Sequence, residues 1–307
     1  MILSCGESLI DMLPRETAAG EMAFAPYPGG AVFNTAVALG RLRAPSGFLS
    51  GISNDLFGAK LTASLAESKV DTSLAARSDR PTTLAFVTLT DGQASYAFYD
   101  ENTAGRMLAV ADLPDVPDSV EAMFFGGISL VVEPCGATYE ALMLREAGHR
   151  VTMIDPNIRP GFIRDEATYR ARIDRMIAVA DVVKISDEDL SWILGPGDPG
   201  DQARALLERG PSLICVTEGA KGARGVSREH DVWVDATKVD VVDTVGAGDT
   251  FNAGVLASLH TGDALSKPAI AALNADAIRA ALALGAQAAA VTVSRAGANP
   301  PWARELA

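Results

Sequence analysis

Residues 243–251, with the one-letter sequence DTVGAGDTF, combine a run of small residues with a carboxylate at the start of a helix-forming stretch. Gly246, Ala247 and Gly248 can turn the chain tightly and direct several backbone N–H groups into one space, an arrangement that attracts phosphate. Each well-placed donor supplies on the order of 3 kcal/mol of transition-state stabilisation. Because phosphoryl transfer depends on positioning and on neutralising charge, the pattern predicts an anion hole at these three residues.

Asp249 directly follows this turn, where a carboxylate can accept the proton of an attacking hydroxyl. General-base catalysis of this kind is worth roughly 10²- to 10⁴-fold in rate. The competing interpretation is that Asp249 only caps a helix and that the glycines only make a turn. The nine residues alone do not decide between the two.

Six further segments contain polar residues, in five of them together with glycine or proline. They are GESLID (6–11), PGGAVFNTA (28–36), FYDENTA (98–104), DPNIRP (155–160), VTEGAKG (216–222) and GANPP (297–301). With DTVGAGDTF they follow the order of the ribokinase-like, or PfkB, family of carbohydrate kinases, which the chain resembles over nearly its whole length, most closely the fructokinase-type members. The resemblance implies ATP-dependent phosphorylation of a small sugar hydroxyl, of fructose or a related ketose, with Asp249 as general base.

The resemblance also implies a sugar site. Its residues, besides Asp249, are Asp11, Gly29, Gly30, Asn34, Phe98, Asn157 and Arg159. An aspartate such as Asp11 is an acceptor-only group suited to sugar hydroxyls, and an asparagine offers both a donor and an acceptor. Without the resemblance, Gly29 and Gly30 would be a loop before a helix, Arg159 a solvated surface residue and Phe98 a core residue of a small sheet.

For ATP, the resemblance implicates Lys184, Thr217, Gly219, Gly222, Gly246, Gly248 and Ala286. Magnesium is expected to be held mainly by ATP oxygens and waters. The acidic motif at 186–189 reads SDED, where relatives carry Asn first and Glu fourth, so Glu188 and Asp189 both remain candidates for contacting a magnesium-bound water. Asp243 is the candidate anchor for a monovalent cation such as K⁺. Glu218 departs from the apolar or basic residue of relatives, which predicts unusual nucleotide preference or affinity.

Composition limits the partners of this chain. Its 307 residues carry 26 Lys and Arg against 39 Asp and Glu, and the net charge of −13 opposes binding to nucleic acid or anionic lipid. The three cysteines, Cys5, Cys135 and Cys215, form no CxxC pair, so neither a zinc cluster nor a disulfide framework is expected. No signal sequence or membrane span is expected either, and a reducing cytoplasm fits best.

Apolar runs alternate with alanine-rich helical stretches, which predicts an α/β fold with a doubly wound, mostly parallel sheet in one domain, 1–307. Strands are expected at 2–5, 47–50, 123–125, 151–154, 182–185 and 213–216, and helices at 31–42, 56–68, 250–260 and 269–290, the last with a break. Segments 9–24 and 82–105 are expected to form a small β-sheet lid with a turn at Asp91 and Gly92, although a decorative hairpin is the alternative. Its open edge favours a homodimer.

Other function classes lack their motifs. No GxGxxG follows an early strand, which opposes a dehydrogenase, and GxxxxGK[ST] is absent, which opposes a P-loop kinase. The histidines His149, His230 and His260 have no metal-binding spacing. The remaining alternatives are a kinase for 2-keto-3-deoxygluconate, a ribosyl compound or a nucleoside, and a sugar-binding regulator without catalytic activity.

Overall fold

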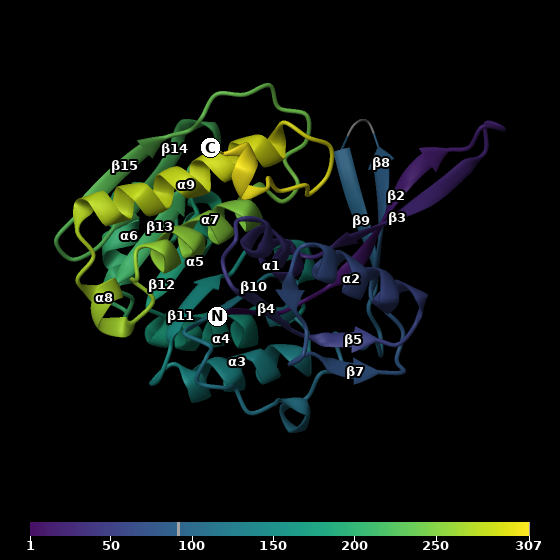
Figure 1. Ribbon diagram of the computed structural model, residues 1–307, viewed down its shortest axis with the longest axis horizontal. Coiled ribbons are helices and arrows are strands. Elements are labelled where there is room, and N and C mark those ends of the chain that lie inside the picture. Colours follow the sequence, from purple (N-terminus) through teal and green to yellow (C-terminus); the bar gives the residue numbers. More distant parts are fainter. Residues whose placement is uncertain (91–92, 307) are drawn as a thin grey trace.

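The computed structural model describes residues 1–90 and 93–306, and within them a sheet of nine strands forms the centre of the molecule (Figure 1). From one edge to the other the strands are β15 (Asp231–Asp235), β14 (Gly222–Val226), β13 (Leu213–Thr217), β12 (Val182–Ser186), β11 (Val151–Asp155), β10 (Ala122–Gly126), β1 (Ile2–Cys5), β4 (Ser46–Leu49) and β6 (Val70–Asp71). β14 is antiparallel to both of its neighbours and the other pairs are parallel. The expected α/β class and mostly parallel sheet are therefore confirmed.

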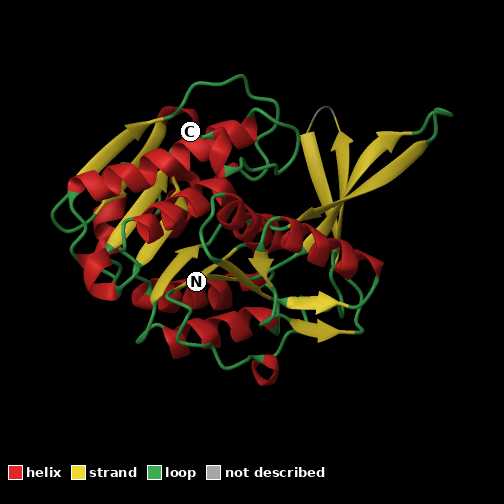
Figure 2. Ribbon diagram, viewed as in Figure 1, coloured by secondary structure: helices red, strands yellow, loops and turns green. Residues whose placement is uncertain are grey.

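Helices cover both faces of this sheet (Figure 2). One face carries α1 (Ala31–Arg41), α2 (Leu56–Glu67), α7 (Ala247–Thr261), α8 (Lys267–Ala271) and α9 (Ala275–Val293), and the other carries α3 (Cys135–Glu146), α4 (Glu166–Val179), α5 (Asp187–Leu194) and α6 (Pro199–Leu207). Strands covered on both faces must be apolar on both, because side chains alternate along a strand.

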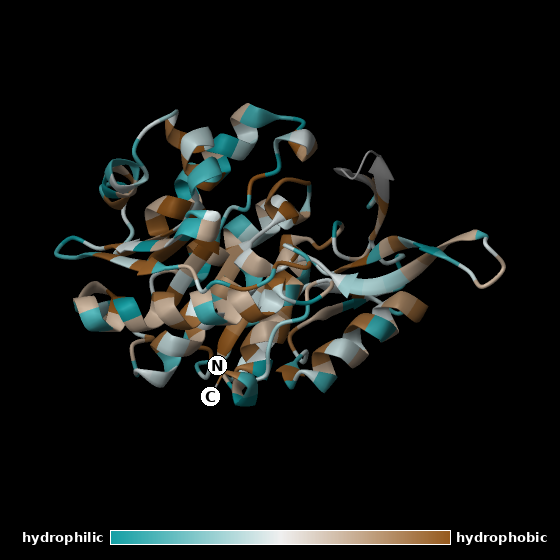
Figure 3. Cartoon of the chain, turned by 90° about the horizontal axis from the view of Figure 1, so that it is seen from above, coloured by the Kyte–Doolittle hydropathy of each residue, from teal (hydrophilic) through white to brown (hydrophobic). Residues whose placement is uncertain are grey.

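Strand β13 shows this alternation: Leu213 and Cys215 lie in the core beneath α7 and α9, whereas Ile214 and Val216 lie in the core beneath α5 and α6. Burying one such aliphatic side chain is worth roughly 1.5–3 kcal/mol. Figure 3 shows hydrophobic segments gathered inside the larger part of the molecule, with hydrophilic ones mostly in its outer helices and loops. Two apolar layers thus hold the sheet in place. The strand ends, which carry polar side chains, are positioned by this packing.

A second sheet of four strands projects from this body (Figure 1). Its order is β3 (Met22–Gly29), β2 (Leu9–Glu16), β8 (Leu84–Thr90) and β9 (Gln93–Tyr99), and a small third sheet pairs β5 (Gly51–Ser53) with β7 (Ala76–Ser78). The expected small sheet is therefore confirmed, while its expected turn at Asp91 and Gly92 lies outside the described residues. The segment expected at 9–24 is too short, because β3 continues to Gly29. Pro28 is tolerated there since β3 is an edge strand.

Helix boundaries follow local capping. Asp55 caps α2 by accepting hydrogen bonds from the N–H groups of Phe57 and Gly58 at 3.0 and 2.7 Å. The helix expected at 250–260 begins earlier, at Ala247. The break expected within 269–290 is real, since α8 ends at Ala271 and α9 begins at Ala275.

Among the described residues, one helix, α9, is long and apolar enough by length and composition to cross a membrane. It packs on α7 through Gly254 and Gly285, where a Cβ on Gly254 would come within 2.5 Å of the Cα of Gly285. Small residues permit this close approach of two backbones.

Candidate active site

The carboxyl ends of the parallel strands define the edge at which the site is built. From β1 the chain continues to β4 on one side of the sheet and later to β10 on the other, so the strand order reverses at β1. Ligands of open α/β sheets bind beyond the strand ends at such a switch point. Three polar groups emerge there: Glu7 just after β1, Asp155 at the end of β11, and Lys184 near the end of β12.

Asp249 faces this edge from the first turn of α7. The helix begins after Gly246, whose φ of 78° lies in the left-handed region that favours glycine. Ala247 and Gly248 are the first two helical residues, so the predicted phosphate-binding turn is the amino terminus of α7. The N–H of Ala247 donates to the carbonyl of Thr244 at 3.3 Å. The N–H of Gly248, two residues into the helix, has no intrahelical partner and can receive an anion.

The carboxylate of Asp249 is buried and held by one side chain from α1. Asn34 Nδ2 donates to Asp249 Oδ2 at 2.9 Å, and Thr35 Oγ1 donates to the Asp249 carbonyl at 3.2 Å. Burial raises the pKa of Asp249 to about 7; the nearby Asp155 also raises it, whereas the Asn34 hydrogen bond and Lys184 lower it. A carboxyl group poised near neutral pH is suited to exchange a proton with substrate.

Asp11 lies on β2 opposite Tyr27 of β3, and its side chain reaches over Gly29 of the same neighbouring strand. A Cβ on Gly29 would come within 2.1 Å of Asp11 Oδ2, so only glycine leaves room for the carboxylate. Burial raises the pKa of Asp11 to about 6. Gly30 follows with φ of 107° and begins α1, which carries Asn34. Asp11 and Asn34 are therefore joined through a short, glycine-dependent connection.

Glu7 fixes the start of α1. Its Oε1 accepts from the N–H of Ala31 at 2.9 Å and its Oε2 accepts from the N–H of Ser129 at 3.3 Å. A Cβ on Gly127 would come within 2.1 Å of Oε1. A carboxylate at a helix amino terminus is stabilised by the helix dipole. No local sequence pattern predicts this role of Glu7, because both of its partners are distant in sequence.

Lys184 and Asp155 form a buried ion pair beside the first turn of α7. Lys184 Nζ lies 2.9 Å from Asp155 Oδ2, which also accepts from Asn252 Nδ2 at 2.7 Å. A Cβ on Gly248 would lie 3.1 Å from Lys184 Nζ, so the ammonium group adjoins the first turn of α7. Asp155 and Asn252 were missed as functional residues. The signal for Asn252 was its spacing of three from Asp249, which places both on one helix face.

Three sequence-predicted substrate residues lie around the loop after β11. Asn157 adopts φ of 45°, and Arg159 is exposed, with Nη1 donating to the Ile158 carbonyl at 2.9 Å. The ring of Phe98, on β9 of the small sheet, meets Phe162 edge to face with centroids 4.7 Å apart. The small sheet thus contacts the loop that carries Asn157 and Arg159.

The two magnesium candidates differ in exposure. Glu188 is exposed, whereas Asp189 is buried and accepts from the N–H of Ile158 at 3.2 Å. Burial, and next the charge of Asp155, raise the pKa of Asp189 to about 6. Ser186, the departure from the family pattern, caps α5 by accepting from the Asp189 N–H at 3.0 Å. Within the described ranges, no group of three His, Cys, Asp or Glu residues could hold a metal ion alone.

The remaining candidates lie on one side of the turn. Thr217 ends β13 next to Ser186 of β12, while Gly219 and Gly222 adopt φ of 54° and 143°. Glu218 forms an ion pair with Lys221 at 3.4 Å. Ala286 is half-buried on α9 and packs against the core.

Asp243 precedes the turn and joins it to the end of the chain. Its Oδ1 accepts from the Val245 N–H at 3.0 Å and its Oδ2 accepts from the Gly297 N–H at 2.9 Å. The carboxylate therefore fixes the approach to α7.

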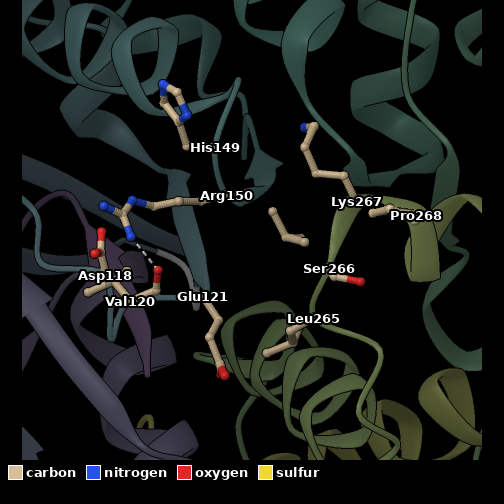
Figure 4. Close-up of a pocket in the computed structure, with 10 residues that line it drawn as sticks. Asp118, Val120, Glu121, His149, Arg150, Leu265, Ser266, Lys267 and Pro268 are labelled. Carbon is tan, nitrogen blue, oxygen red and sulfur yellow. Dashed lines mark hydrogen bonds between the residues drawn. The ribbon is translucent and has the colours of Figure 1, made fainter.

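A cavity of about 610 Å³ lies at the other edge of the sheet, where β10 and β11 begin (Figure 4). Its Arg150 and Lys267 are already paired: Arg150 Nε with Glu146 at 2.8 Å and Lys267 Nζ with Asp181 at 2.7 Å. It contains none of the residues grouped around Asp249, so it is separate from the candidate active site.

Comparison with known proteins agrees with this geometry. The model of the pfkB family of carbohydrate kinases matches residues 1–304. A fructokinase of Rhizobium leguminosarum bv. trifolii is 56% identical over 279 residues, covering 91% of this chain and 86% of its own length. Fructokinase of Xylella fastidiosa with bound ATP superposes with a TM-score of 0.87 at 28% identity, covering 99% and 97% of the two chains. A fructokinase double mutant of Vibrio cholerae O395, in a form with fructose, ADP and potassium bound, gives 0.83 at 25% identity and 97% and 93% coverage.

Proposed function

We propose that this chain, which belongs to the pfkB family of carbohydrate kinases and is a sugar kinase, transfers the γ-phosphoryl group of ATP to a hydroxyl of fructose or a related ketose. The observation that carries the proposal is the position of Asp249, a buried carboxyl at the amino terminus of α7 held by Asn34. The fructokinase relatives support fructose as the acceptor.

Asp249 acts as the general base. The sugar hydroxyl gives its proton to the Asp249 carboxylate while its oxygen forms a bond to the γ-phosphorus. The bond from that phosphorus to the bridging oxygen breaks, and the electron pair leaves with ADP. The amino terminus of α7, at Gly246, Ala247 and Gly248, is the anion hole that offsets the charge on the transferring group.

The sugar binds between the small sheet and the strand ends. Asp11 accepts hydrogen bonds from sugar hydroxyls, and Gly29 and Gly30 let the backbone approach closely. Asn34, Asn157 and Arg159 complete the polar wall. Phe98 covers the sugar as part of a lid, supported by its packing on Phe162 beside Arg159. Segments 9–24 and 82–105, with β3 extended to Gly29, make up this lid on a single domain.

ATP binds along the strand ends beside α7, at Lys184, Thr217, Gly219, Gly222, Gly246, Gly248 and Ala286. The buried ammonium of Lys184 next to Gly248 supports this assignment. Magnesium, when bound, neutralises charge on the phosphate oxygens. The residues fit a metal held through water: Oδ1 of Asp155 and Oδ1 of Asn252 are buried without a hydrogen-bond partner among the described residues, and Asp189 lies nearby. The exposed Glu188 is the second candidate.

A monovalent cation is proposed near Asp243, because a fructokinase relative is described with potassium bound. Asp243 would act there through the lone pairs that its two backbone hydrogen bonds leave free. The prediction is a rise in kcat on adding KCl in place of a bulky organic chloride.

A homodimer formed through the small sheet is also proposed. Met22, Phe24, Tyr27 and Tyr99 expose 75%, 40%, 44% and 63% of their surface on this sheet. Exposed apolar patches and open strand edges favour association. Light scattering at micromolar concentration should give twice the monomer mass, and a monomer would count against the proposal.

The buried, free cysteines Cys5, Cys135 and Cys215 support the proposed reducing, cytoplasmic location.

The substrate is tested by measuring ADP release with a panel that contains fructose, other ketoses, 2-keto-3-deoxygluconate, ribosides and nucleosides. The proposal expects the highest kcat/KM with fructose. A clear preference for another compound would move the chain to a different branch of the same enzyme class. No ADP release from any compound would favour a sugar-binding regulator.

A further inference from the structure

We infer that Asp155 is a positioning residue that holds the Lys184 ammonium group beside Gly248, so that the two oppositely charged residues together set the charge around Asp249. The inference rests on the proposed role of Asp249 as general base. It assigns functions to Asp155 and Asn252, which no sequence motif marked as site residues.

The two charged residues point to the same side of the sheet. Asp155 lies two residues after Met153 on β11, and Lys184 lies two residues after Val182 on β12, so each shares a face of the sheet with an apolar residue of the core beneath α7. The side chains of Asp155 and Lys184 are only 3% and 6% exposed. Burial and the pairing of β11 with β12 therefore restrict the movement of both side chains. Lys184 is held in one position beside Gly248.

Asn252 completes the arrangement from α7. Its Nδ2 donates to the same Asp155 oxygen that meets Lys184, at 2.7 Å. Asn252 lies three residues after Asp249, so the helix that carries the carboxyl group also holds the counter-ion of the lysine. Any shift of α7 would therefore disturb the Asn252–Asp155 and the Asn34–Asp249 hydrogen bonds together.

Stability alone is a weak reason for this ion pair. Burying two charges costs several kcal/mol each before their attraction is counted, and apolar residues of similar volume are often as good. Oδ1 of Asp155 has no hydrogen-bond partner within the described residues, which adds to the cost. The pair lies beside the amino terminus of α7, where a fixed positive charge would meet a phosphate.

Besides burial, four groups act on the pKa of Asp249, each from a different element, and Asn34 does so by direct contact. Asn34 comes from α1, Glu7 from the connection after β1, Asp155 from β11 and Lys184 from β12. Asp155 and Glu7 disfavour the charged carboxylate, whereas Asn34 and Lys184 favour it. Removing Asp155 must therefore lower the pKa of Asp249, and removing Lys184 must raise it.

The test uses Asp155→Asn, Lys184→Met and the double variant, with kcat/KM for the sugar measured from pH 5 to 9. The acidic limb of the profile should move down in pH in Asp155→Asn and up in Lys184→Met, by at least about 0.5 unit each. The double variant should lie between the two. Calorimetry with a nonhydrolysable ATP analogue should show affinity about 10-fold weaker in Lys184→Met and several-fold weaker in Asp155→Asn, because the lysine remains but is no longer held.

A matched control comes from the other end of β11. Lys267 Nζ lies 2.7 Å from both carboxylate oxygens of Asp181, which also accepts from the Thr152 N–H of β11 at 2.9 Å (Figure 4 shows Lys267). Lys267→Met breaks a lysine–aspartate pair that is tied to the same strand but far from Asp249. It should lower the Tm and leave both the pH profile and the nucleotide affinity unchanged.

Lys184→Arg keeps the positive charge and should leave the acidic limb within about 0.2 unit of the wild type. If Asp155→Asn fails to fold, the comparison of Lys184→Arg with Lys184→Met still tests whether the charge at position 184 sets the acidic limb. Shifts of the same sign in Asp155→Asn and Lys184→Met, or unchanged nucleotide affinity in both, would overturn the inference. Failure of the general-base role is distinguishable, since it would appear as normal turnover in Asp249→Asn.

Discussion

Asn34 Nδ2 donates a 2.9 Å hydrogen bond to Oδ2 of Asp249, joining α1 to the first turn of α7 across 215 residues of sequence. Glu7 fixes the start of α1, and Asp11 lies against Gly29, two residues before that helix. The bond therefore links the proposed sugar-binding strand to the proposed catalytic carboxyl group through one helix.

Asn34→Ala should raise the pKa of Asp249, because it removes a hydrogen bond that stabilises the carboxylate. The expected result is a fall in kcat of roughly 10-fold at pH 7, with partial recovery at pH 8.5. Asn54→Ala is the matched control, since Asn54 makes a 2.8 Å bond to Asp79 away from the site. An Asn34→Ala profile parallel to the wild type at all pH values would contradict the assignment.

The pH dependence of the wild-type enzyme follows from the pKa of Asp249, which burial raises to about 7. A general base must be deprotonated, so kcat/KM should fall as the pH drops below about 7. The contribution of Asp249 to the stability of the fold changes with pH in the opposite direction to kcat/KM. The folded state holds this proton between about pH 4 and 7 and the unfolded state does not, so this group lowers the free energy of unfolding as the pH rises.

Chemical denaturation at pH 5 and pH 8 checks the stability half of this prediction. Relative to Asp249→Asn, the wild type should have a lower free energy of unfolding at pH 8 than it has at pH 5. A shift in its favour would contradict the burial argument.

Asp11→Ala should raise the KM for the sugar at least about 10-fold and leave the KM for ATP within about twofold, because a carboxylate that accepts sugar hydroxyls is lost. Gly29→Ala should act in the same direction, since its Cβ would displace Asp11 Oδ2. Gly148→Ala is the control, because a Cβ there has nothing within 4 Å. Equal effects on both KM values would place Asp11 outside the sugar pocket.

Close packing of α7 on α9 depends on Gly254. Gly254→Val should lower the free energy of unfolding by roughly 1–3 kcal/mol, since the added atoms would overlap the backbone at Gly285. Thermal melting measures this change. Unchanged stability would mean that the two helices can separate without cost.

The sheet and the small second sheet could be predicted because their signals are local. Apolar runs such as Leu213–Thr217 end in polar residues, and hairpin-like alternation marks β8 and β9. The end of β3 could not be predicted from local sequence, because Pro28 and Gly29 resemble a loop. Only their pairing with β2 makes them part of a strand. The start of α7 was placed too late for a similar reason: Gly248 disfavours a helix by itself and is accommodated in the first turn.

Site residues divide along the same line. Asp249 and Gly246 lie in one short motif and could be proposed from it. Glu7, Asp155 and Asn252 act through partners 24, 29 and 97 residues away, which no local pattern reveals. Predicting them required the sheet order and the side of the sheet to which each residue points.

The most direct measurement of the central claim compares Asp249→Asn with the wild type in steady-state turnover and in binding of a nonhydrolysable ATP analogue. Asp276→Asn is the matched control, since it changes an exposed aspartate in the first turn of α9. We predict that kcat falls at least about 100-fold in Asp249→Asn while nucleotide affinity and folding persist. Turnover within a few-fold of the wild type would show that Asp249 is not the base.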